Sequence, residues 1–545
     1  MPWVALVGPE IEENLSLRYI ASSLAVAGYG SEIVPFNSEA DFGPALESIL
    51  SAKDPPLLVG ISLAFQWRAS DFLALAVGLR QGGYRGHITV GGHFATFASV
   101  EILSDFPELD SVVRQEAEET VVTLVRTIEA QGELAGVPGL TVRDASGAVI
   151  KTSHAALPDI ARIPWPDRRG EPAACFAHPI SPLVSSRGCY ANCSFCCIAA
   201  WQEQSLPGKR YRIRDVADVA DEMLHMQRTR GIEIFVFHDD NFFVPGHKRN
   251  AARFSALADA LEQRGIGPFA TVVKARPTDV DAGVFRILQQ RLHCIRVYIG
   301  IETDADQGLQ TLRRWSPARQ NRKAIEIARS LELYTCFNML LFDPDTTLES
   351  LRTNIEFIRY APEFPSNFGR VELYAGTPLL ARMQAEGRTS GDYLQWDYRL
   401  ASPEVERVFE LSMRCFATRN FGPEALANRI MGTRFDVEVC RHFHPSSVAV
   451  EWLEQGKALS AALARDSADG LEAILDHVAH APVGADEAFV GALSSKLRAT
   501  EAAISRGAIE LARRLQRTVG RGMPLTDIGD RVATPLQSQR LAVGV

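Results

Sequence analysis

Short hydrophobic runs alternate with longer stretches of helical periodicity through about the first 116 residues of the chain. Roughly 10–20 residues with apolar positions at helical spacing follow most of the runs. Such alternation predicts a doubly wound, Rossmann-like α/β domain, in which helices cover both faces of a parallel sheet. The predicted strands are Val4–Val7, Glu32–Phe36, Leu57–Ala64, His87–Gly91 and Ser111–Arg114.

The end of this domain is expected to be a hairpin. Residues 139–152 read GLTVRDASGAVIKT and place Ser146-Gly147 between two β-rich runs. The first domain is therefore assigned to residues 1–150. Four prolines in the following stretch, LPDIARIPWPDRRGEPAA, interrupt both periodicities, which is typical of a linker at residues 151–181.

A second series of strands and helices begins near residue 182. Six such units predict a partial (β/α)6 barrel over residues 182–385, with its sites at the carboxyl ends of the strands. Strand signals then fade, so residues 386–519 are expected to be mainly helical and residues 520–545 to form a poorly ordered tail. The predicted strands are Leu183–Ser186, Ile232–His238, Phe269–Lys274, Ile295–Glu302, Tyr334–Phe342 and Gly369–Tyr374.

Composition narrows the class of protein. At 545 residues the chain exceeds the size of one hydrophobic core, so two or three domains are expected. A net charge of -9 argues against a nucleic-acid surface and favours a small-molecule or peptide substrate. No apolar run approaches the ~20 residues of a membrane span, and the acidic start does not resemble a signal peptide. Nine cysteines, an odd number, indicate reduced thiols and a cytoplasmic location.

Four of the nine cysteines fall within RGCYANCSFCC, directly after the first strand of the second series. Cys189, Cys193 and Cys196 have the spacing C-x3-C-x2-C, and thiolates select iron–sulfur clusters and other soft metals. Cys197 follows Cys196 directly and is expected to point away from it. A structural zinc site is the alternative, but it needs four ligands and the chain offers no second cysteine pair. Three ligands leave one iron of a [4Fe-4S] cluster open to bind another molecule.

This motif, with an aromatic residue before its last cysteine, resembles the radical S-adenosylmethionine (SAM) family over about residues 182–385. The resemblance implies that the open iron chelates SAM and that an electron splits the sulfonium to give a 5′-deoxyadenosyl radical. It also implies an external electron donor such as flavodoxin or ferredoxin. The implied SAM-binding residues are Phe195, Asp239, Asp240, Gly300 and Glu302.

Most of these residues lie at predicted strand ends. FVFHDDNF ends the second strand of the barrel series and VYIGIETDAD ends the fourth, where polar groups of SAM need acceptors. A helix N-cap or a turn explains Asp240-Asn241 equally well. A surface carboxylate at a strand end is the alternative for Glu302.

The amino-terminal domain carries a second set of residues. ITVGGHFATF places two glycines at the end of a strand, where doubly wound sheets bind ligands; a tight strand–helix turn is the alternative. With one serine a strand earlier and a glutamate a strand later, the set resembles the cobalamin-binding domains that precede many radical SAM barrels. The implied cobalamin-binding residues are Ser62, Gln66, Arg68, Gly91, Gly92, His93, Thr96 and Glu116.

One departure concerns the lower face of the cobalt. Cobalamin domains of the methionine-synthase type carry D-x-H-x-x-G after the first strand, whereas this chain has GPEIEENLSLRY, without a histidine. We therefore expect no histidine as lower ligand, and His93 is expected to pack in a turn or loop. Gln66 and Arg68 are candidates for the space under the corrin ring; an ordinary helix start is the alternative.

Together the two resemblances imply a cobalamin-dependent radical SAM methyltransferase. Its methyl group would pass from SAM via methylcobalamin to an unactivated carbon, or phosphorus, of a small-molecule or peptide natural-product precursor. Cyclisation or ring rearrangement without net methylation is the alternative. A cobalamin-sensing regulator has no use for the cysteines, and an electron-transfer protein would want a fourth. The helical region 386–519 is expected to line the substrate site. Arg370, Glu372 and Tyr374 alternate along the sixth strand, so they share one face of it and are candidates for contact with the substrate.

Overall fold

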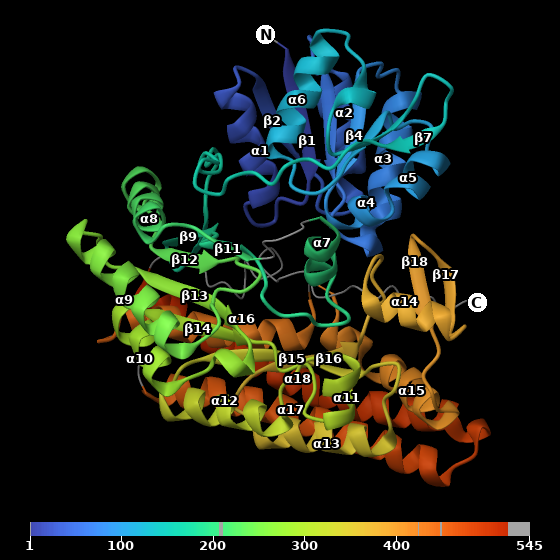
Figure 1. Ribbon diagram of the computed structural model, residues 1–545. Helices are drawn as coiled ribbons and strands as arrows, with labels where there is room; N and C mark the ends of the chain where they lie inside the picture. Colours follow the sequence, from blue (N-terminus) through green and yellow to red (C-terminus); the bar gives the residue numbers. More distant parts are fainter. Residues whose placement is uncertain (1, 206–210, 423, 447–449, 521–545) are drawn as a thin grey trace. The chain divides into compact units, whose positions relative to one another are not determined.

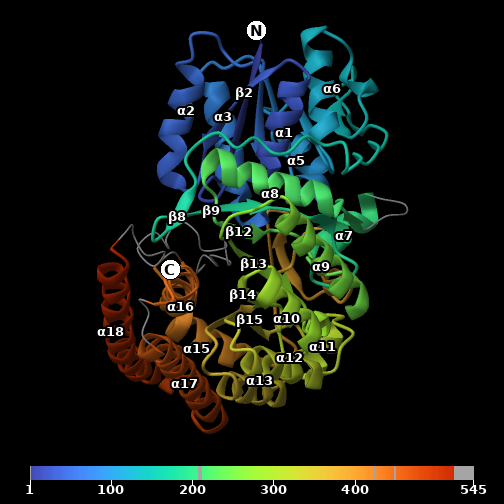
Figure 2. The same ribbon diagram turned by 90° about the vertical axis from the view of Figure 1, so that its left-hand side faces the viewer.

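The computed structural model describes residues 2–205, 211–422, 424–446 and 450–520 (Figures 1 and 2). The chain divides into two compact units, each assembled from segments that are far apart in the sequence. Unit 1 consists of Met1–Glu171, Ser194–Arg214 and Glu372–Asp397, and unit 2 consists of Pro172–Cys193, Asp215–Val371 and Tyr398–Val545. The stretch expected to form the barrel, 182–385, therefore contributes to both units.

A seven-stranded sheet forms the centre of unit 1, in the order β2-β1-β3-β4-β5-β6-β7. The first five strands are parallel, and the last two are antiparallel. Winding reverses between β1 and β3, the position at which doubly wound sheets bind ligands. The strands are β1 (Trp3–Gly8), β2 (Gly30–Pro35), β3 (Leu58–Ser62), β4 (His87–Gly91), β5 (Ser111–Val113), β6 (Leu140–Arg143) and β7 (Val149–Lys151).

Helices cover both faces of this sheet. Those numbered 2 and 3 share one buried cluster with the strands, and those numbered 1 and 6 share another. Figure 2 shows these two pairs of helices on opposite sides of the sheet. The predicted doubly wound fold is confirmed. The helices are α1 (Leu15–Val26), α2 (Phe42–Leu50), α3 (Ala69–Gln81), α4 (His93–Phe97), α5 (Ser99–Asp105) and α6 (Glu118–Glu129).

The hairpin that closes the sheet is also confirmed. In its turn, Asp144 Oδ1 accepts hydrogen bonds from the backbone N–H groups of Ser146 at 2.8 Å and Ala148 at 3.1 Å. Gly147 has φ 85°, a left-handed conformation that glycine adopts without a Cβ penalty. The predicted turn at Ser146-Gly147 is therefore confirmed.

Two later segments complete unit 1. Trp201 meets the ring of His93 edge-on, with centroids 5.0 Å apart, and Tyr393 stacks on Phe94 at 6.5 Å. The expectation of a mainly helical region from residue 386 missed the hairpin that carries Tyr393. The elements are α7 (Cys197–Ser205), β11 (Tyr211–Ile213), α14 (Pro378–Ala385), β17 (Thr389–Asp392) and β18 (Gln395–Tyr398).

Unit 2 is built on a second seven-stranded sheet, in the order β16-β15-β14-β13-β12-β9-β8. Six strands are parallel and β8 is antiparallel to β9, so the predicted partial barrel is confirmed. The strands are β8 (Ala173–Cys175), β9 (His178–Leu183), β12 (Ile234–Phe237), β13 (Ala270–Ala275), β14 (Cys294–Ile299), β15 (Thr335–Phe342) and β16 (Ser366–Arg370), with the short β10 (Ser186–Gly188) after β9.

Helices lie on both sides of this sheet (Figure 2). Those that connect the strands are α8 (Val216–Arg230), α9 (His247–Gln263), α10 (Ala282–Arg291), α11 (Asp306–Thr311), α12 (Ala318–Ser330) and α13 (Leu348–Tyr360). Those that follow are α15 (Pro403–Asn420), α16 (Leu426–Phe443), α17 (Val450–His480) and α18 (Asp486–Val519). Phe435 and Val439 of α16 join Ile234 and Ile295 in one buried cluster. Among the described helices, none is long and apolar enough to cross a membrane.

Three expectations need correction. The linker 151–181 contains β8 and the first residues of β9, and the strand expected at Leu183–Ser186 ends at Leu183. Two prolines, Pro179 and Pro182, lie inside β9. The sixth strand ends at Arg370, so the expected alternation beyond it is wrong. The tail lies outside the described residues from 521 onward.

Candidate functional site

The cysteine loop of unit 2 is held by the strand end beside it. Asp239, two residues after the end of β12, is fully buried and accepts hydrogen bonds from the backbone N–H of Ser185 at 3.1 and 3.0 Å and from its hydroxyl at 2.7 Å. The hydroxyl of Ser186 also donates to this carboxylate. Burial raises the pKa of Asp239, while Arg253 and the two serines oppose the rise. The carboxylate therefore fixes the turn that leads into the cysteines.

The next two residues reach the loop itself. Asp240 Oδ2 accepts a hydrogen bond from the backbone N–H of Gly188 at 2.9 Å, and Asn241 Nδ2 lies 3.7 Å from Cys189 Sγ. Asn241 Oδ1 also accepts from the backbone N–H of Phe243, which fixes the orientation of its amide. The residues that the sequence offered as SAM ligands or as a turn thus bind the cysteine loop in the structure.

The sulfur atoms of this loop receive N–H donors. The backbone N–H of Ala191 lies 3.4 Å from Cys189 Sγ, and Arg314 Nη1 lies 3.6 Å from Cys193 Sγ. Burial raises the pKa of Cys189, and the N–H donors oppose the rise. All nine cysteines are described, and none of them is paired in a disulfide bond. Cys196 belongs to unit 1, where it immediately precedes α7.

Arg314 was missed by sequence reasoning, because the adjacent arginines of LRRW gave no signal as to which one points inward. Its side chain is 6% exposed and donates to the carbonyl oxygen of Gly300. Arg314 Nη1 also lies 3.9 Å from Glu302 Oε1. One guanidinium therefore joins Cys193 to two of the predicted SAM-binding positions.

Glu302 has an unusual backbone conformation. Its φ is 63°, left-handed for a residue with a Cβ, and its backbone bridges to β15, where its N–H donates to Asn338 O at 3.2 Å. The side chain is 18% exposed, so the alternative of a surface carboxylate is wrong. Burial raises the pKa of Glu302, and Arg314 and Arg276 oppose the rise. Strained backbone of this kind is concentrated at functional sites.

A pocket of about 400 Å³, with both polar and apolar residues in its lining, lies beside the loop. Its lining includes Tyr190, whose hydroxyl donates to Asp279, and Arg276, whose guanidinium lies 5.6 Å from the centre of the Tyr190 ring. Arg314 also lines it, so the pocket and the cysteine loop share a side chain. Within the described residues, no three His, Cys, Asp or Glu side chains are gathered as around a metal ion.

In unit 1, the predicted glycines lie at the carboxyl edge of the sheet. Ser62 pairs with Gly91 in the register of β3 and β4. Gly92 has φ 118°, and a Cβ there would meet the carbonyl oxygen of Leu63 at 2.9 Å. Thr96 Oγ1 donates to Gly92 O at 2.8 Å and accepts from the backbone N–H of Gln115 at 2.9 Å. The turn is therefore specific for glycine, as the alternative interpretation required.

Other predicted cobalamin ligands are engaged inside unit 1. Gln66 Oε1 accepts from the backbone N–H of Ala375 at 3.1 Å. The buried Arg68 donates to Phe36 O at 3.1 Å, and its guanidinium lies 4.7 Å from the centre of the Phe72 ring. Glu116 pairs with Arg212, and His93 packs on Trp201. These side chains stabilise the edge of the sheet.

The predicted substrate residues do not form one row. Arg370 is buried, with its guanidinium 3.6 Å from the ring centre of Tyr398 and 4.8 Å from that of Phe409. It belongs to unit 2, whereas Glu372 and Tyr374 belong to unit 1. Burial raises the pKa of Glu372.

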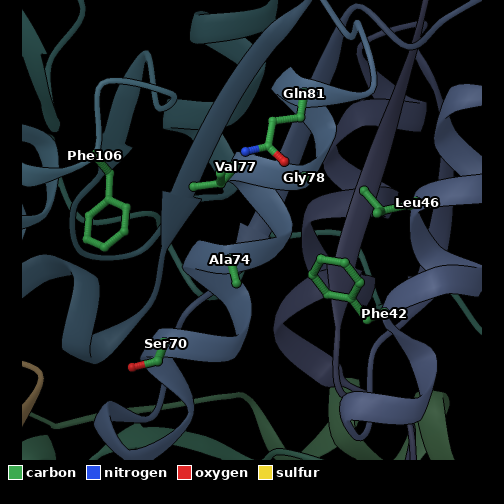
Figure 3. Close-up of a pocket in the computed structure, with 8 residues that line it drawn as sticks. All are labelled: Phe42, Leu46, Ser70, Ala74, Val77, Gly78, Gln81 and Phe106. Carbon is green, nitrogen blue, oxygen red and sulfur yellow. The ribbon is translucent and has the colours of Figure 1, made fainter.

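A second pocket, of about 500 Å³, lies in unit 1 between α2 and α3 (Figure 3). Phe42 and Leu46 lie on one side of α3, where a Cβ at Gly78 would meet both at 3.2 Å, whereas Val77 points to the other side, on which Phe106 lies. Its lining is mainly apolar and includes none of the predicted cobalamin ligands.

Comparison with known families now defines the class. Residues 4–125 match the family described as B12 binding domain, and residues 183–358 match the radical SAM superfamily. The chain therefore combines a region that matches the B12-binding domain with a later region that matches the radical SAM superfamily. Both resemblances inferred from the sequence are confirmed.

Curated relatives are distant. An uncharacterized methyltransferase of Pyrococcus horikoshii is 25% identical over 54% of this chain and 62% of that protein. An anaerobic magnesium-protoporphyrin IX monomethyl ester cyclase of Cereibacter sphaeroides is 24% identical over 54% of this chain and 47% of that protein. The hopanoid C-3 methylase of Methylococcus capsulatus is 26% identical over 71% and 72%. The chain thus spans less than two thirds of the first two.

Solved structures share the fold. The cobalamin-dependent SAM radical enzyme OxsB, with aqua-cobalamin and SAM bound, superposes with a TM-score of 0.67 at 17% identity, over 98% of this chain and 84% of that one. The radical SAM methyltransferase TsrM from Kitasatospora setae, with cobalamin and a [4Fe-4S] cluster bound, gives a TM-score of 0.59 at 18% identity, over 72% and 76%.

Proposed function

We propose that this chain is a cobalamin-dependent radical SAM methyltransferase that acts on a small-molecule or peptide substrate. The observation that carries the proposal is the link from Cys193 through Arg314 to Glu302, at the carboxyl ends of the strands of a radical SAM barrel. In the same chain, a B12-binding domain has a glycine-specific turn at its ligand-binding edge.

The cysteine loop suits a [4Fe-4S] cluster. Cys189, Cys193 and Cys196 are the proposed ligands, and N–H donors to sulfur tune such clusters. Asn241 orients Cys189, and Asp239 fixes the turn before it. When bound, the cluster and SAM supply one-electron chemistry, and cobalamin supplies a methyl carrier.

SAM is proposed to lie at the strand ends that Arg314 joins. The carboxylate of Glu302 is a hydrogen-bond acceptor held at a fixed place by its backbone bridge to β15. Arg314 keeps a positive charge beside it and beside Cys193. Phe195, Asp240 and Gly300 remain proposed members of this site.

The corrin is proposed to rest on the carboxyl edge of unit 1. Ser62, Gly91 and Gly92 would let a large ring approach the backbone, because none of them carries a bulky side chain there. The segment after β1 contains no histidine, so the lower face of the cobalt is proposed to lack an imidazole from it. Arg68 and Gln66 would support this edge from inside the unit.

Anaerobic reconstitution with iron, sulfide and hydroxocobalamin tests the proposal. The wild-type protein should show the optical and paramagnetic signals of both cofactors. After chemical reduction with SAM present, both S-adenosylhomocysteine and 5′-deoxyadenosine should form. Cys193→Ala should lose the cluster and keep the corrin. A zinc site, or a cluster with four protein ligands, would contradict the proposal.

The alternative is cyclisation or ring rearrangement without net methylation. It is favoured by the similarity to the anaerobic cyclases, 24% identical in Cereibacter sphaeroides and 27% in a Synechocystis relative. The two functions differ in their products. A methyltransferase forms S-adenosylhomocysteine in proportion to methylated product. An enzyme of the alternative kind forms 5′-deoxyadenosine without a matching amount of S-adenosylhomocysteine.

A further inference from the structure

Trp315, in unit 2, has a large aromatic side chain that is mostly exposed to solvent. It is 79% exposed and has φ 53°, although bulky residues rarely adopt left-handed backbone. Arg313, two residues earlier in the chain, has φ 49° and is also exposed. Burial does not explain this conformation, because the side chain points out of the fold. Strain that packing does not repay is a reason to look for a function.

The tryptophan is one of the residues that line the pocket beside the cysteine loop. Tyr190, Ala191 and Asn192, the three residues between Cys189 and Cys193, line the same pocket. Arg314 forms part of its wall, and its Nη1 lies 3.6 Å from Cys193 Sγ. The pocket is therefore separated from a proposed cluster ligand by a single side chain.

Exposed basic residues adjoin the pocket-lining residues in the sequence, although the chain as a whole has a net charge of -9. Lys248 and Arg249 follow the pocket residue His247 and are exposed, and Arg313 and Arg319 flank Trp315 in the sequence. Of three acidic side chains in the same segments, two contact other side chains and the third is exposed. Asp279 accepts from Tyr190, Asp281 lies 3.6 Å from His247, and Asp306 is exposed at the start of α11.

We propose that this basic rim, defined as His247, Lys248, Arg249, Arg313, Trp315 and Arg319, is the docking surface for an acidic one-electron carrier protein. The inference rests on the proposed function, which requires an electron at the cluster. Complementary charge accelerates and orients encounter, and an exposed aromatic ring supplies a contact near the centre of an interface. The loop between Cys189 and Cys193 then lies at the bottom of the interface.

The electron balance is simple. The reduced carrier loses one electron and the oxidised cluster gains one; no bond forms between the proteins, and no proton moves at a rim residue. The rim residues have no role in SAM cleavage. A small chemical reductant should therefore bypass them.

Reconstituted protein and a purified bacterial flavodoxin, reduced by its reductase, test the surface. The variant is Arg313→Glu/Arg319→Glu, and a second is Trp315→Ala. The matched control, Arg352→Glu/Arg498→Glu, changes the net charge equally at two exposed arginines on α13 and α18. Two quantities are measured at low ionic strength: the Kd by calorimetry, and the rate of cluster reduction by paramagnetic resonance.

The charge-reversed variant should bind flavodoxin about tenfold more weakly and be reduced about tenfold more slowly, and salt should diminish the difference from wild type. Trp315→Ala should also bind more weakly, with less dependence on salt. Both should be reduced normally by titanium(III) citrate, which shows that fold and cluster are intact. The control should match wild type with either reductant.

Equal flavodoxin binding and reduction in wild type and both variants would overturn the docking surface, as would an equal loss in the control. If wild type holds no reducible cluster with titanium(III) citrate, the proposed function itself fails. The two failures are therefore distinguishable.

Discussion

At the scale of single residues, the candidate site depends on one guanidinium that contacts three groups. Arg314 approaches Cys193 at 3.6 Å and Glu302 at 3.9 Å, and it donates to the carbonyl oxygen of Gly300. A lysine could not reproduce this, because its ammonium is a point donor rather than a planar fork. Cluster ligand and strand end are thus coupled by a single side chain.

Replacing Arg314 by methionine should destabilise the protein even without cofactors. The change leaves the largely buried Glu302 carboxylate with the more weakly acting Arg276 but without Arg314, which costs about 3 kcal/mol. Urea unfolding of cofactor-free protein measures this. Arg313→Met, at the exposed neighbour, is the control and should be close to neutral. Adding Glu302→Gln to Arg314→Met should restore much of the loss; no restoration would show that the two side chains are not coupled.

At the scale of elements, hydrophobic pattern predicted most strands well and their partners poorly. The strand His87–Gly91 was predicted with the bounds it has, because its apolar residues are continuous and a glycine pair ends it. The cover that α16 gives to the barrel strands was not predicted. The helical periodicity around Phe435 is the same whichever surface this side chain packs on. Phe435 shares a buried cluster with Ile234, which lies about 200 residues away in the sequence. Such long-range packing leaves no local signal.

The pair of strands β4 and β5 should make stability depend on pH. His87 Nε2 lies 2.8 Å from Ser111 Oγ, and burial lowers the pKa of His87 from 6.5 to about 4 although Asp110 opposes the shift. Between pH 4 and 6.5, His87 is therefore protonated in the unfolded chain and neutral in the folded chain. The free energy of unfolding is therefore highest above pH 6.5, where His87 is neutral in both states. It falls by about 3 kcal/mol as the pH drops towards 4.

His87→Gln tests this dependence, because an amide can still bond Ser111 but does not titrate in this range. The free energy of unfolding of the variant, measured by urea between pH 4 and 7, should fall less steeply than that of wild type. His225→Gln, at an exposed histidine of α8, is the control and should keep the wild-type slope. Parallel curves for all three proteins would contradict the assignment.

At the scale of the whole molecule, compact units and sequence domains do not coincide. Sequence patterns gave contiguous borders, 1–150 and 182–385, since alternation of strands and helices is read along the chain. The structure instead adds Ser194–Arg214 and Glu372–Asp397 to unit 1. No local pattern in WQEQ indicates that Trp201 packs on His93, so this part could not be predicted. The cysteine motif itself is divided, with Cys193 in one unit and Cys196 in the other.

This division predicts that the amino-terminal segment alone is incomplete. A fragment ending at residue 171 lacks the ring that packs on His93, the backbone N–H that Gln66 accepts, and Tyr393, whose hydroxyl donates to Asp105 at 2.8 Å. It also uncovers Phe94, because Tyr393 no longer stacks on it. The fragment should therefore bind a hydrophobic dye and lose its structure at a lower temperature than unit 1 does in the full chain. Circular dichroism and dye fluorescence measure both.

The full-length double variant Trp201→Ala/Tyr393→Ala should shift part of the way in the same direction, because it removes two of these contacts and keeps the chain intact. A fragment as stable as the unit in the full chain, with no dye binding, would show that the later segments add nothing to its fold.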